Sequence, residues 1–388
     1  MPAPHDYLIV GAGLFGATFA RRMADAGKRC LVIDKRAHIG GNCHTRVVEG
    51  IHVHAYGPHI FHCNDERIWA FVNRFARFNG FRNAPIAIAR GKAYSLPFSM
   101  YTFHQLWGVT TPAEALQRIA AQRLDLQGRE PANLEEHALA LVGRDVYETL
   151  VRHYTAKQWM REPRELPAAI LKRLPFRLTW DNSYFDDRFQ GIPIGGYTRM
   201  VERMLGGIEV RTGVDYLAER DALDALATTT VYTGCIDEFF DYADGELQYR
   251  TLRFESDIHP CSNWQGNAVV NYSDPEVPWT RSIEHRHFDN DPSVPVTCVT
   301  REIPDRWARG KIPFYPVGDA ANLARHERYL ARAAALPRHV FGGRLAQYRY
   351  YDMHQVIGSA LSVAQRVLRE GGARAQGTHA VASTADSR

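Results

Sequence analysis

The sequence lacks the features that mark several special classes of protein. Its six cysteines form no CxxC pair and no metal-ligand cluster, which argues against a zinc site and a disulfide framework: Cys30, Cys43, Cys63, Cys235, Cys261 and Cys298. No run approaches the roughly 18 apolar residues of a membrane-spanning helix, and no signal peptide precedes the first predicted strand. We therefore expect a cytoplasmic protein with reduced thiols and no membrane partner.

The charge is nearly balanced and widely spread. The 47 basic residues only slightly outnumber the 43 acidic residues, and the arginines are scattered rather than run together. This pattern argues against a nucleic-acid partner but allows a local basic cleft for a small anion. At 388 residues the chain exceeds the size at which one core usually keeps growing, so we expect two or three lobes.

The chain opens with a predicted strand, a glycine turn, a helix and a second strand. The stretches "YLIV", "GAGLFG" and "KRCLVID" carry this order, which is typical of a dinucleotide-binding domain. Gly11 permits a tight turn, Gly13 lets the backbone approach a pyrophosphate, and Gly16 allows close packing of helix on strand. Asp34 ends the second strand, where its carboxylate can accept a hydrogen bond from a ribose hydroxyl.

NAD and FAD share this pattern, and the next residues separate them only in part. The stretch "DKRAHIGGN" places a basic residue and the pair Gly40–Gly41 after Asp34, as in flavoproteins of the amine-oxidase-like group. A plain glycine turn explains the same residues equally well. This stretch by itself therefore leaves the cofactor open.

The remaining chain predicts an α/β fold with three lobes. Apolar residues at helical spacing run from about 100 to 172, and short β-rich runs divided by turn residues fill about 245–315. We predict a discontinuous Rossmann-like domain (1–80, 200–244 and 335–370), a mainly helical lobe (100–178) and an antiparallel β-sheet lobe (81–99, 179–199 and 245–334). Residues 371–388 are small and polar without periodicity, which predicts a disordered tail.

Four further stretches carry a resemblance to a known family. They are "YGPHIFH" (56–62), "YTAKQW" (154–159), "NSYFDDRFQGIPIGGYTRM" (182–200) and "GGRLAQYRYYDMHQVI" (342–357). With these stretches in the family's order, the chain resembles the bacterial UDP-galactopyranose mutases from its first strand to about Leu368. Two departures concern peripheral contacts: "VGDAAN" after Tyr315, and His354, where an acidic residue is common.

The resemblance implies an isomerase that interconverts UDP-galactopyranose and UDP-galactofuranose. In such enzymes N5 of reduced FAD attacks the anomeric carbon while UDP leaves, and no electrons are gained or lost overall. The product supplies galactofuranose for cell-surface polysaccharide, that is, for cell wall biosynthesis. The resemblance further implies that the Rossmann-like domain binds FAD, that residues 160–178 form a mobile lid, and that the protein is a homo-oligomer, a dimer or higher.

The resemblance also assigns site residues. Those placed on FAD are Gly11, Gly13, Phe15, Gly16, Asp34, Lys35, Gly41, Asn42, His59, Ile60, Val214, Thr233, Gly234, Arg344, Tyr350, Asp352 and Met353. Those placed on the nucleotide sugar are Asn83, Tyr154, Thr155, Trp159, Arg173, Phe176, Tyr184, Asn271, Arg281, Tyr315 and Tyr350. Arg173, Arg281 and His62 are the candidate catalytic residues, and no metal is implied.

The residue types suit these roles. Arginines make bidentate contacts with a diphosphate, and lowering the charge on a departing pyrophosphate assists bond cleavage. Tyrosine hydroxyls bind phosphate without adding charge, and aromatic rings offer uracil a flat surface. Without the resemblance, such arginines would more often be surface residues and such aromatics part of the core. His62 stands in a Gly-Pro loop and is a candidate proton shuttle without a definite acid–base role.

Two alternatives from other classes stay open. An FAD-dependent oxidase or dehydrogenase of the amine-oxidase-like group would share the FAD half, but neither the paired arginines nor "YTAKQW". A non-catalytic nucleotide-sugar binding protein would need no redox cofactor beside the sugar. No second GxGxxG occurs, which disfavours a built-in nicotinamide site, so the sequence does not identify the reductant.

Overall fold

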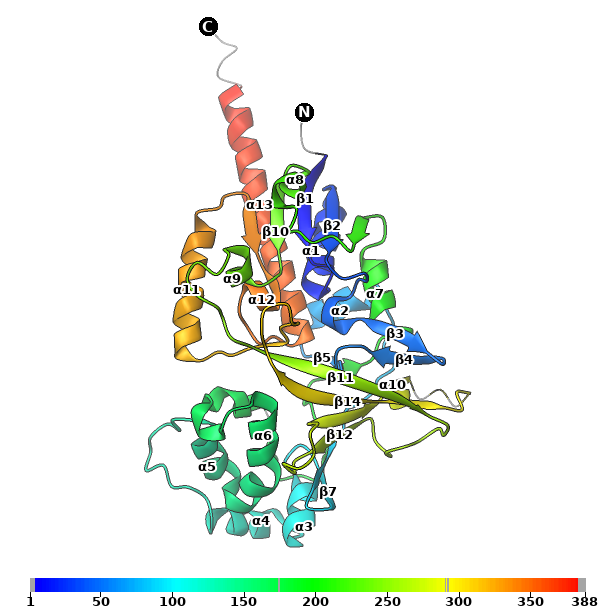
Figure 1. The fold of residues 1–388 in the computed structure, drawn as a ribbon, viewed down its shortest axis with the longest axis vertical. Coiled ribbons are helices and arrows are strands. Elements are labelled where there is room, and N and C mark those ends of the chain that lie inside the picture. Colours follow the sequence, from blue (N-terminus) through cyan, green and yellow to red (C-terminus); the bar gives the residue numbers. More distant parts are fainter. Residues whose placement is uncertain (1–3, 174, 290, 292, 383–388) are drawn as a thin grey trace.

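The chain folds into three stacked parts (Figure 1). The computed structural model describes residues 4–173, 175–289, 291 and 293–382, without the side chains of 169, 172, 173 and 371–382. An α/β part with strand β1 and helix α13 lies at the top of Figure 1, long strands cross the middle, and a bundle of helices lies at the bottom. Within the described chain, no helix is both long and apolar enough to cross a membrane.

The α/β part is built on a five-stranded parallel sheet. Its strands, in spatial order, are β16 (His339–Phe341), β10 (Ala227–Tyr232), β1 (His5–Val10), β2 (Cys30–Asp34) and β9 (Glu209–Thr212). All four neighbouring pairs are parallel. The inner strand β2 is buried at every position, as parallel strands covered on both faces usually are. The predicted Rossmann-like domain is thereby confirmed.

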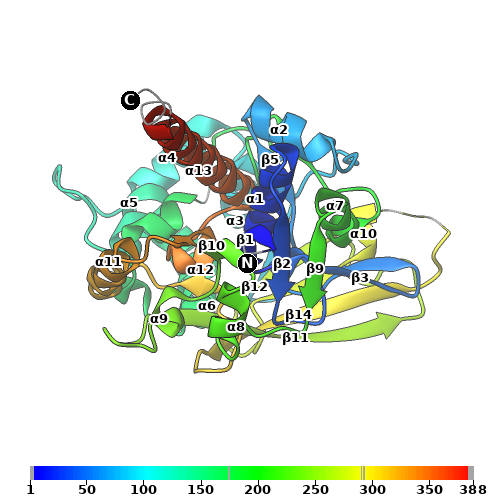
Figure 2. The ribbon, with the colours of Figure 1, turned by 90° about the horizontal axis from the view of Figure 1, so that it is seen from above.

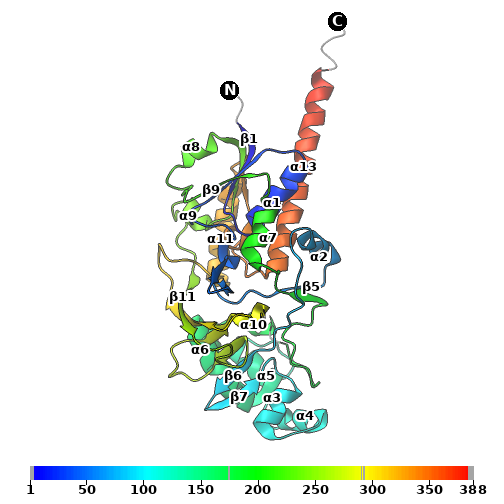
Figure 3. The same ribbon diagram turned by 90° about the vertical axis from the view of Figure 1, so that its right-hand side faces the viewer.

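Helices cover both faces of this sheet. Figure 3 shows α1 (Leu14–Asp25), α7 (Gly196–Met204) and α13 (Met353–Ala382) on one side, and α8 (Arg220–Asp224) and α9 (Ile236–Phe239) on the other. Helix α11 (Ala320–Ala334) contacts α9 and β16, and its His326 bonds the Ala346 carbonyl of α12 (Gly343–Ala346) at 3.1 Å. Figure 2 shows α11 and α12 on the same side of the molecule. Helix α11 falls within residues 245–334, which the sequence predicts as part of the sheet lobe.

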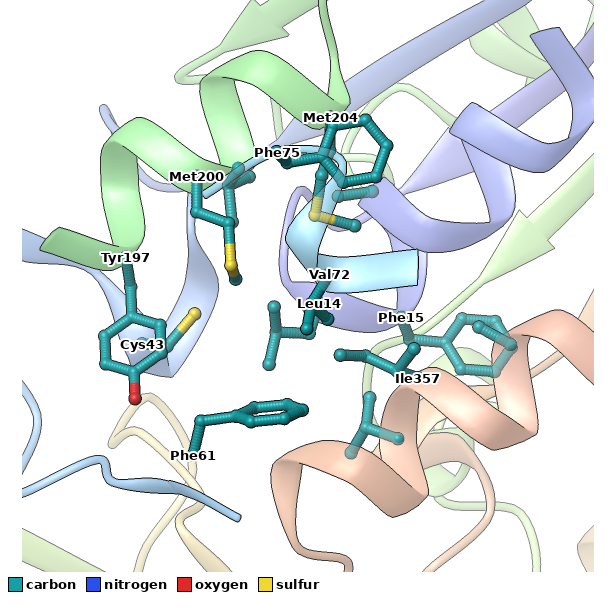
Figure 4. Close-up of a cluster of buried hydrophobic side chains, with 14 of the residues drawn as sticks. Leu14, Phe15, Cys43, Phe61, Val72, Phe75, Tyr197, Met200, Met204 and Ile357 are labelled. Carbon is teal, nitrogen blue, oxygen red and sulfur yellow. The ribbon is translucent and has the colours of Figure 1, made fainter. Parts of the chain in front are cut away.

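One apolar core joins the ends of the chain. Figure 4 shows Leu14 of α1 between Met200 of α7 and Ile357 of α13, with Phe15 on the side of Ile357 and Phe61 below. These side chains belong to one buried cluster. It also holds α2 (Glu66–Asn73) and the two-stranded sheet of β5 (Phe61–Cys63) and β8 (Phe189–Gly191).

Helix α13 continues through residues 371–382, which the sequence analysis had placed in a disordered tail; residues 383–388 lie outside the described chain.

The middle part is a seven-stranded sheet. Its order is β15 (Tyr315–Pro316), β11 (Tyr249–His259), β14 (Thr297–Arg306), β13 (Arg281–Glu284), β12 (Val269–Tyr272), β6 (Ile86–Ala89) and β7 (Lys92–Ser95). Neighbours are antiparallel except β12 and β6, which are parallel. The predicted antiparallel sheet therefore contains one parallel pair, because β6 arrives from a distant part of the chain rather than through a hairpin.

The helical lobe fills residues 100–173. It comprises α3 (Met100–Trp107), α4 (Pro112–Ala120), α5 (Leu134–Val146), the π-helical turn η2 (Tyr147–Val151), α6 (Arg152–Trp159) and the 3₁₀ turns η3 (Pro163–Glu165) and η4 (Ala168–Arg173). Thr111 and Glu114 form a capping box that starts α4. Smaller elements are η1 (Gly41–Cys43), α10 (Arg286–Asp289) and the hairpin of β3 (Thr45–Val48) with β4 (Ile51–His54). The residue boundaries of the three predicted lobes stay predictions.

Candidate active site

One large cavity lies where the three parts meet. It encloses about 1110 Å³ and is lined by residues of the parallel sheet, the seven-stranded sheet and the helical lobe. The predicted residues on its wall are Gly11, Gly13, Phe15, Gly16, Asp34, Lys35, Gly41, Asn42, His59, Ile60, His62, Asn83, Tyr154, Trp159, Tyr184, Val214, Thr233, Gly234, Asn271, Arg281, Tyr315, Arg344, Tyr350, Asp352 and Met353. The fold therefore collects residues from nearly the whole length of the chain in one place.

At one end of the cavity, the glycine turn of residues 11–16 and the turn at Gly41 expose backbone without side chains. We call this surface the glycine cradle. Gly11 has φ +110, and a β-carbon on Gly16 would lie 1.9 Å from the carbonyl oxygen of Gly11. The turn at Gly41 also comes close, since a β-carbon on Gly41 would lie 2.9 Å from the Cα of Gly13. Helix α1 begins directly after Gly13, so its N-terminal N–H groups face this space. Such an end suits a dinucleotide pyrophosphate.

Asp34 holds the glycine turn against strand β2. Its Oδ2 accepts a hydrogen bond from the Ala12 amide at 2.8 Å, and its Oδ1 accepts one from the Arg36 amide at 2.9 Å. A carboxylate oxygen has a second lone pair, so Asp34 can still accept a bond from a ribose hydroxyl in the cavity. The sequence predicted only this second role.

Arg344 brings the C-terminal region to the cofactor end. It lies in α12, whose preceding Gly342 packs so tightly that a β-carbon there would lie 2.0 Å from the ring of Phe15. Its Nη2 donates to the Phe314 carbonyl at 2.6 Å, while its Nε is buried without a partner in the described chain. A half-buried guanidinium whose Nε has no partner favours an anionic ligand.

Arg281 supplies positive charge farther along the cavity. Its Nε and Nη2 donate to the two carboxylate oxygens of Glu302, at 3.0 and 2.9 Å. Glu302 has an exposed fraction of 0%. Burial opposes the charge on Arg281, but the carboxylate of Glu302 raises its pKa well above the ordinary value. Arg281 is therefore a fixed cation facing the cavity.

Carboxamide groups near Arg281 have unused hydrogen-bonding capacity. The side-chain oxygens of Asn83, Gln158 and Asn271 are buried without a partner in the described chain, and all three residues line the cavity. Buried polar atoms of this kind usually find a partner, so a ligand rich in hydroxyl groups suits them. Gln158 was not predicted, although it stands within "YTAKQW" next to the predicted Trp159.

Tyrosines complete this end of the cavity. The rings of Tyr315 and Tyr350 meet edge to face, with centroids 5.0 Å apart. Burial raises the pKa of Tyr154 and of Tyr315, so both stay neutral phenols that can donate a hydrogen bond at neutral pH. Trp159 packs against the core of the helical lobe and also lines the cavity.

His62 is held in place by a carboxylate that the sequence analysis missed. Its Nδ1 pairs with Asp187, and its ring stacks on Phe185 at a centroid distance of 3.7 Å. Asp187 also accepts a bond from Asn64. Strands β5 and β8 bring these groups together from positions 125 residues apart. The acidic pair in "YFDDRF" was the one signal that the sequence offered.

His59, the other histidine of this loop, is electrically neutral. Its Nδ1 bonds the Gly57 carbonyl at 2.8 Å, and burial lowers its pKa to about 4. At neutral pH it adds no positive charge to the cofactor end.

Thr155 and Phe176 do not lie on the cavity wall. Thr155 is buried on another face of α6, since adjacent helix positions point about 100° apart whereas Tyr154 and Gln158 share a face. Phe176 forms a bridge with Phe98, which lines the cavity in its place. Arg173 ends η4, and its side chain lies outside the described chain.

Comparisons of the sequence and of the structure with known proteins point to the same family. A model described as UDP-galactopyranose mutase matches residues 149–350, and one for an NAD(P)-binding Rossmann-like domain matches residues 9–75. A probable UDP-galactopyranose mutase of Klebsiella pneumoniae is 38% identical over 94% of each chain. A dTDP-fucopyranose mutase of Escherichia coli is 37% identical over 93% of this chain and 98% of its own. A solved structure of reduced UDP-galactopyranose mutase shares the fold, with TM-score 0.74, 12% identity and 94% coverage of both chains.

Proposed function

This chain belongs to the UDP-galactopyranose mutase family, and on that premise we propose that it interconverts UDP-galactopyranose and UDP-galactofuranose. It is an isomerase, as the family is. One observation carries the choice of substrate: a single cavity joins a dinucleotide cradle to a fixed cation and to buried carboxamides without partners. A sugar linked to a nucleoside diphosphate offers the matching negative charge and hydroxyl groups.

The cofactor is FAD. The residues fit it, because the bare backbone at Gly13 and Gly41 leaves room for a pyrophosphate and Asp34 stands at the end of β2. Reduced FAD supplies a nucleophilic nitrogen, N5, toward the anomeric carbon of the sugar. Arg344 and the N-terminus of α1 would hold the pyrophosphate of the cofactor.

The chain's own residues act mainly on the nucleotide sugar. Arg281 binds the diphosphate and stabilises the charge that develops as UDP leaves. Tyr315, as a neutral phenol, donates a hydrogen bond to a phosphate oxygen, and Tyr154 and Trp159 offer their rings to the uracil. Asn83 and Asn271 orient the sugar hydroxyls, and the enclosing cavity keeps water from the reacting carbon. The pairing with Asp187 fixes the ring of His62 toward the cavity.

In the same proposal, the reduced form of FAD is the active one, the product serves cell-surface polysaccharide, and the enzyme works in the cytoplasm. The homo-oligomer predicted from the sequence stays a prediction.

The test is to incubate chemically reduced protein with UDP-galactofuranose and to follow UDP-galactopyranose by chromatography. We expect turnover that requires reduced flavin and leaves it reduced after many cycles. Equal activity of the fully oxidised protein would contradict the proposal. Bleaching of oxidised flavin by substrate alone would instead favour the oxidase alternative.

A second candidate substrate is a dTDP-linked 6-deoxy sugar. The observation that favours it is the relative named dTDP-fucopyranose mutase, which is 37% identical over 98% of its length. The two candidates differ in the base, in the 2′-hydroxyl of the nucleoside and at C6 of the sugar, and share the diphosphate that Arg281 would bind. Measuring kcat/KM for UDP-galactofuranose and dTDP-fucofuranose with the same reduced protein decides between them.

A further inference from the structure

The side chain of Lys157 is surrounded by backbone carbonyls of one loop. Its Nζ donates to the carbonyl oxygens of Tyr272 at 2.7 Å, Asp274 at 2.8 Å, Val277 at 3.0 Å and Trp279 at 3.2 Å. An ammonium group has three protons, so these four carbonyls share them. Burial lowers the pKa of Lys157 to about 8, which leaves it charged at neutral pH. Lys157 itself does not line the cavity.

The loop that Lys157 fills connects two strands of the site. Residues 273–280 join β12 to β13, and the Tyr272 amide closes the loop on the Thr280 carbonyl at 2.8 Å. The strand register pairs Asn271 with Arg281 directly at the loop ends. Four carbonyls that converge on one point favour a cationic donor there, since buried carbonyls without partners are costly. The ammonium of Lys157 is that donor, and it ties this loop to α6.

Lys157 comes from the opposite wall of the cavity. It lies in α6, the short helix that also carries Tyr154, Gln158 and Trp159 on the cavity side. Its bonds therefore join the helical lobe to the strand ends that carry Asn271 and Arg281. A shift of α6 or of the ends of β12 and β13 would change the distance between the residues that these two walls present to the ligand.

We propose that Lys157 is a positioning residue for the nucleotide sugar. By binding the 273–280 loop to α6, it sets the spacing between Tyr154 and Trp159 on one side and Asn271 and Arg281 on the other. The inference rests on the proposed function, because it concerns the residues that would bind the substrate. The glycine cradle lies on other elements, so FAD binding should not depend on this spacing.

The test compares Lys157→Met, which removes the charge and the donors, with Lys157→Arg, which keeps both. Lys92→Met is the matched control, since Lys92 is an exposed lysine on β7, the edge strand of the same sheet. FAD content and thermal midpoint are measured for each protein, then the Kd for UDP, and kcat and KM with UDP-galactofuranose after reduction.

We expect Lys157→Met to remain folded and to keep FAD. Its kcat/KM should fall by about 100-fold, because Asn271 and Arg281 would no longer lie at the right distance from Tyr154 and Trp159. The Kd for UDP should rise, and Lys157→Arg should recover part of the affinity. Lys92→Met should behave as wild type. A merely structural lysine would instead lower the thermal midpoint and FAD content together with activity.

Unchanged UDP affinity and kcat/KM in folded Lys157→Met would overturn the proposal. If that variant does not fold, Lys157→Gln, which keeps a neutral donor, takes its place under the same criterion. If wild type binds UDP but isomerises neither sugar nucleotide, the proposed function fails, while the UDP affinity of the variants still decides the role of Lys157.

Discussion

A β-carbon on Gly41 would lie 2.9 Å from the Cα of Gly13, so two glycine turns touch through bare backbone. The two positions differ in what a side chain would meet. A β-carbon on Gly13 would come no nearer than 3.7 Å to Gly41, which is ordinary contact. A side chain at Gly13 would therefore not clash with the rest of the protein, but it would occupy the space where the cofactor is proposed to bind.

The first prediction is that Gly13→Val gives folded, colourless protein. The valine side chain would block the approach of the pyrophosphate to the backbone. FAD content is read from the visible spectrum, and folding from circular dichroism. Gly318→Ala is the control, because Gly318 has open space around it and an ordinary φ. Yellow Gly13→Val protein with full FAD content would show that the cradle is not the pyrophosphate site.

The second prediction concerns the buried pair of Arg281 and Glu302. Glu302→Gln keeps the shape but removes the charge that balances Arg281, which should lower the stability of the ligand-free protein by about 3 kcal/mol. The negative charge of a bound diphosphate would again balance the positive charge of Arg281. The rise in thermal midpoint on adding UDP should therefore be larger in Glu302→Gln than in wild type. Equal rises in both proteins would mean that UDP does not bind at Arg281.

Local patterns predicted the glycine turn at one end of the cavity and the strands beside it. The glycine turn, Asp34 and the strands beside them follow from residues close together in the sequence, where spacing alone fixes geometry. The resemblance then identified most cavity-lining residues of the other lobes, such as Asn271 and Arg281. These two face each other only because β12 and β13 pair in the observed register.

What the sequence could not predict depends on long-range pairing. The partner of His62 is Asp187, brought close by the pairing of β5 with β8, and no local pattern links them. The parallel contact of β12 with β6 has the same origin. Phe176, expected on the substrate, does not line the cavity, and its backbone forms a bridge with Phe98. In each case the contact joins segments that are far apart in the sequence, so no local pattern predicts it.

The third prediction is a loss of stability in mild acid. His285 has an exposed fraction of 0%, and burial lowers its pKa from 6.5 to about 3. Below pH 6.5 the unfolded chain takes up a proton that the folded chain does not. The stabilisation is complete above that pH and is lost as pH falls toward 3. At pH 5 the loss should be about 2 kcal/mol from this residue.

Urea unfolding at pH 7 and at pH 5 measures this loss. His285→Gln should be less stable at pH 7, since the Nε2 contact with Thr300 at 2.8 Å is gone, yet should depend less on pH. An equally steep pH dependence in the variant would assign the acid sensitivity to other groups.

The last prediction concerns residues 160–178, which the sequence predicts to be a lid. Two short 3₁₀ turns replace a regular helix there, and Ile170 and Pro175 line the cavity. At its start, Arg161 bonds Asp319 at 3.3 Å and Gln248 at 2.8 Å, which anchors the segment to the other lobes. Closure over the substrate would bring Arg173 to the diphosphate and exclude water.

We expect UDP to protect this segment from thermolysin in wild type, but much less in Arg173→Ala. Thermolysin is chosen because it cuts at apolar residues, so the substitution removes no cleavage site. Turnover of Arg173→Ala should fall about 100-fold, as for the loss of a donor to developing charge, while FAD content stays unchanged because Arg173 is assigned to the substrate. Arg164→Ala, exposed in the preceding turn, is the control and should leave both turnover and protection as in wild type. If Arg173→Ala keeps near-normal turnover, or if UDP does not change the cleavage of wild type, residues 160–178 do not act as a lid over the substrate.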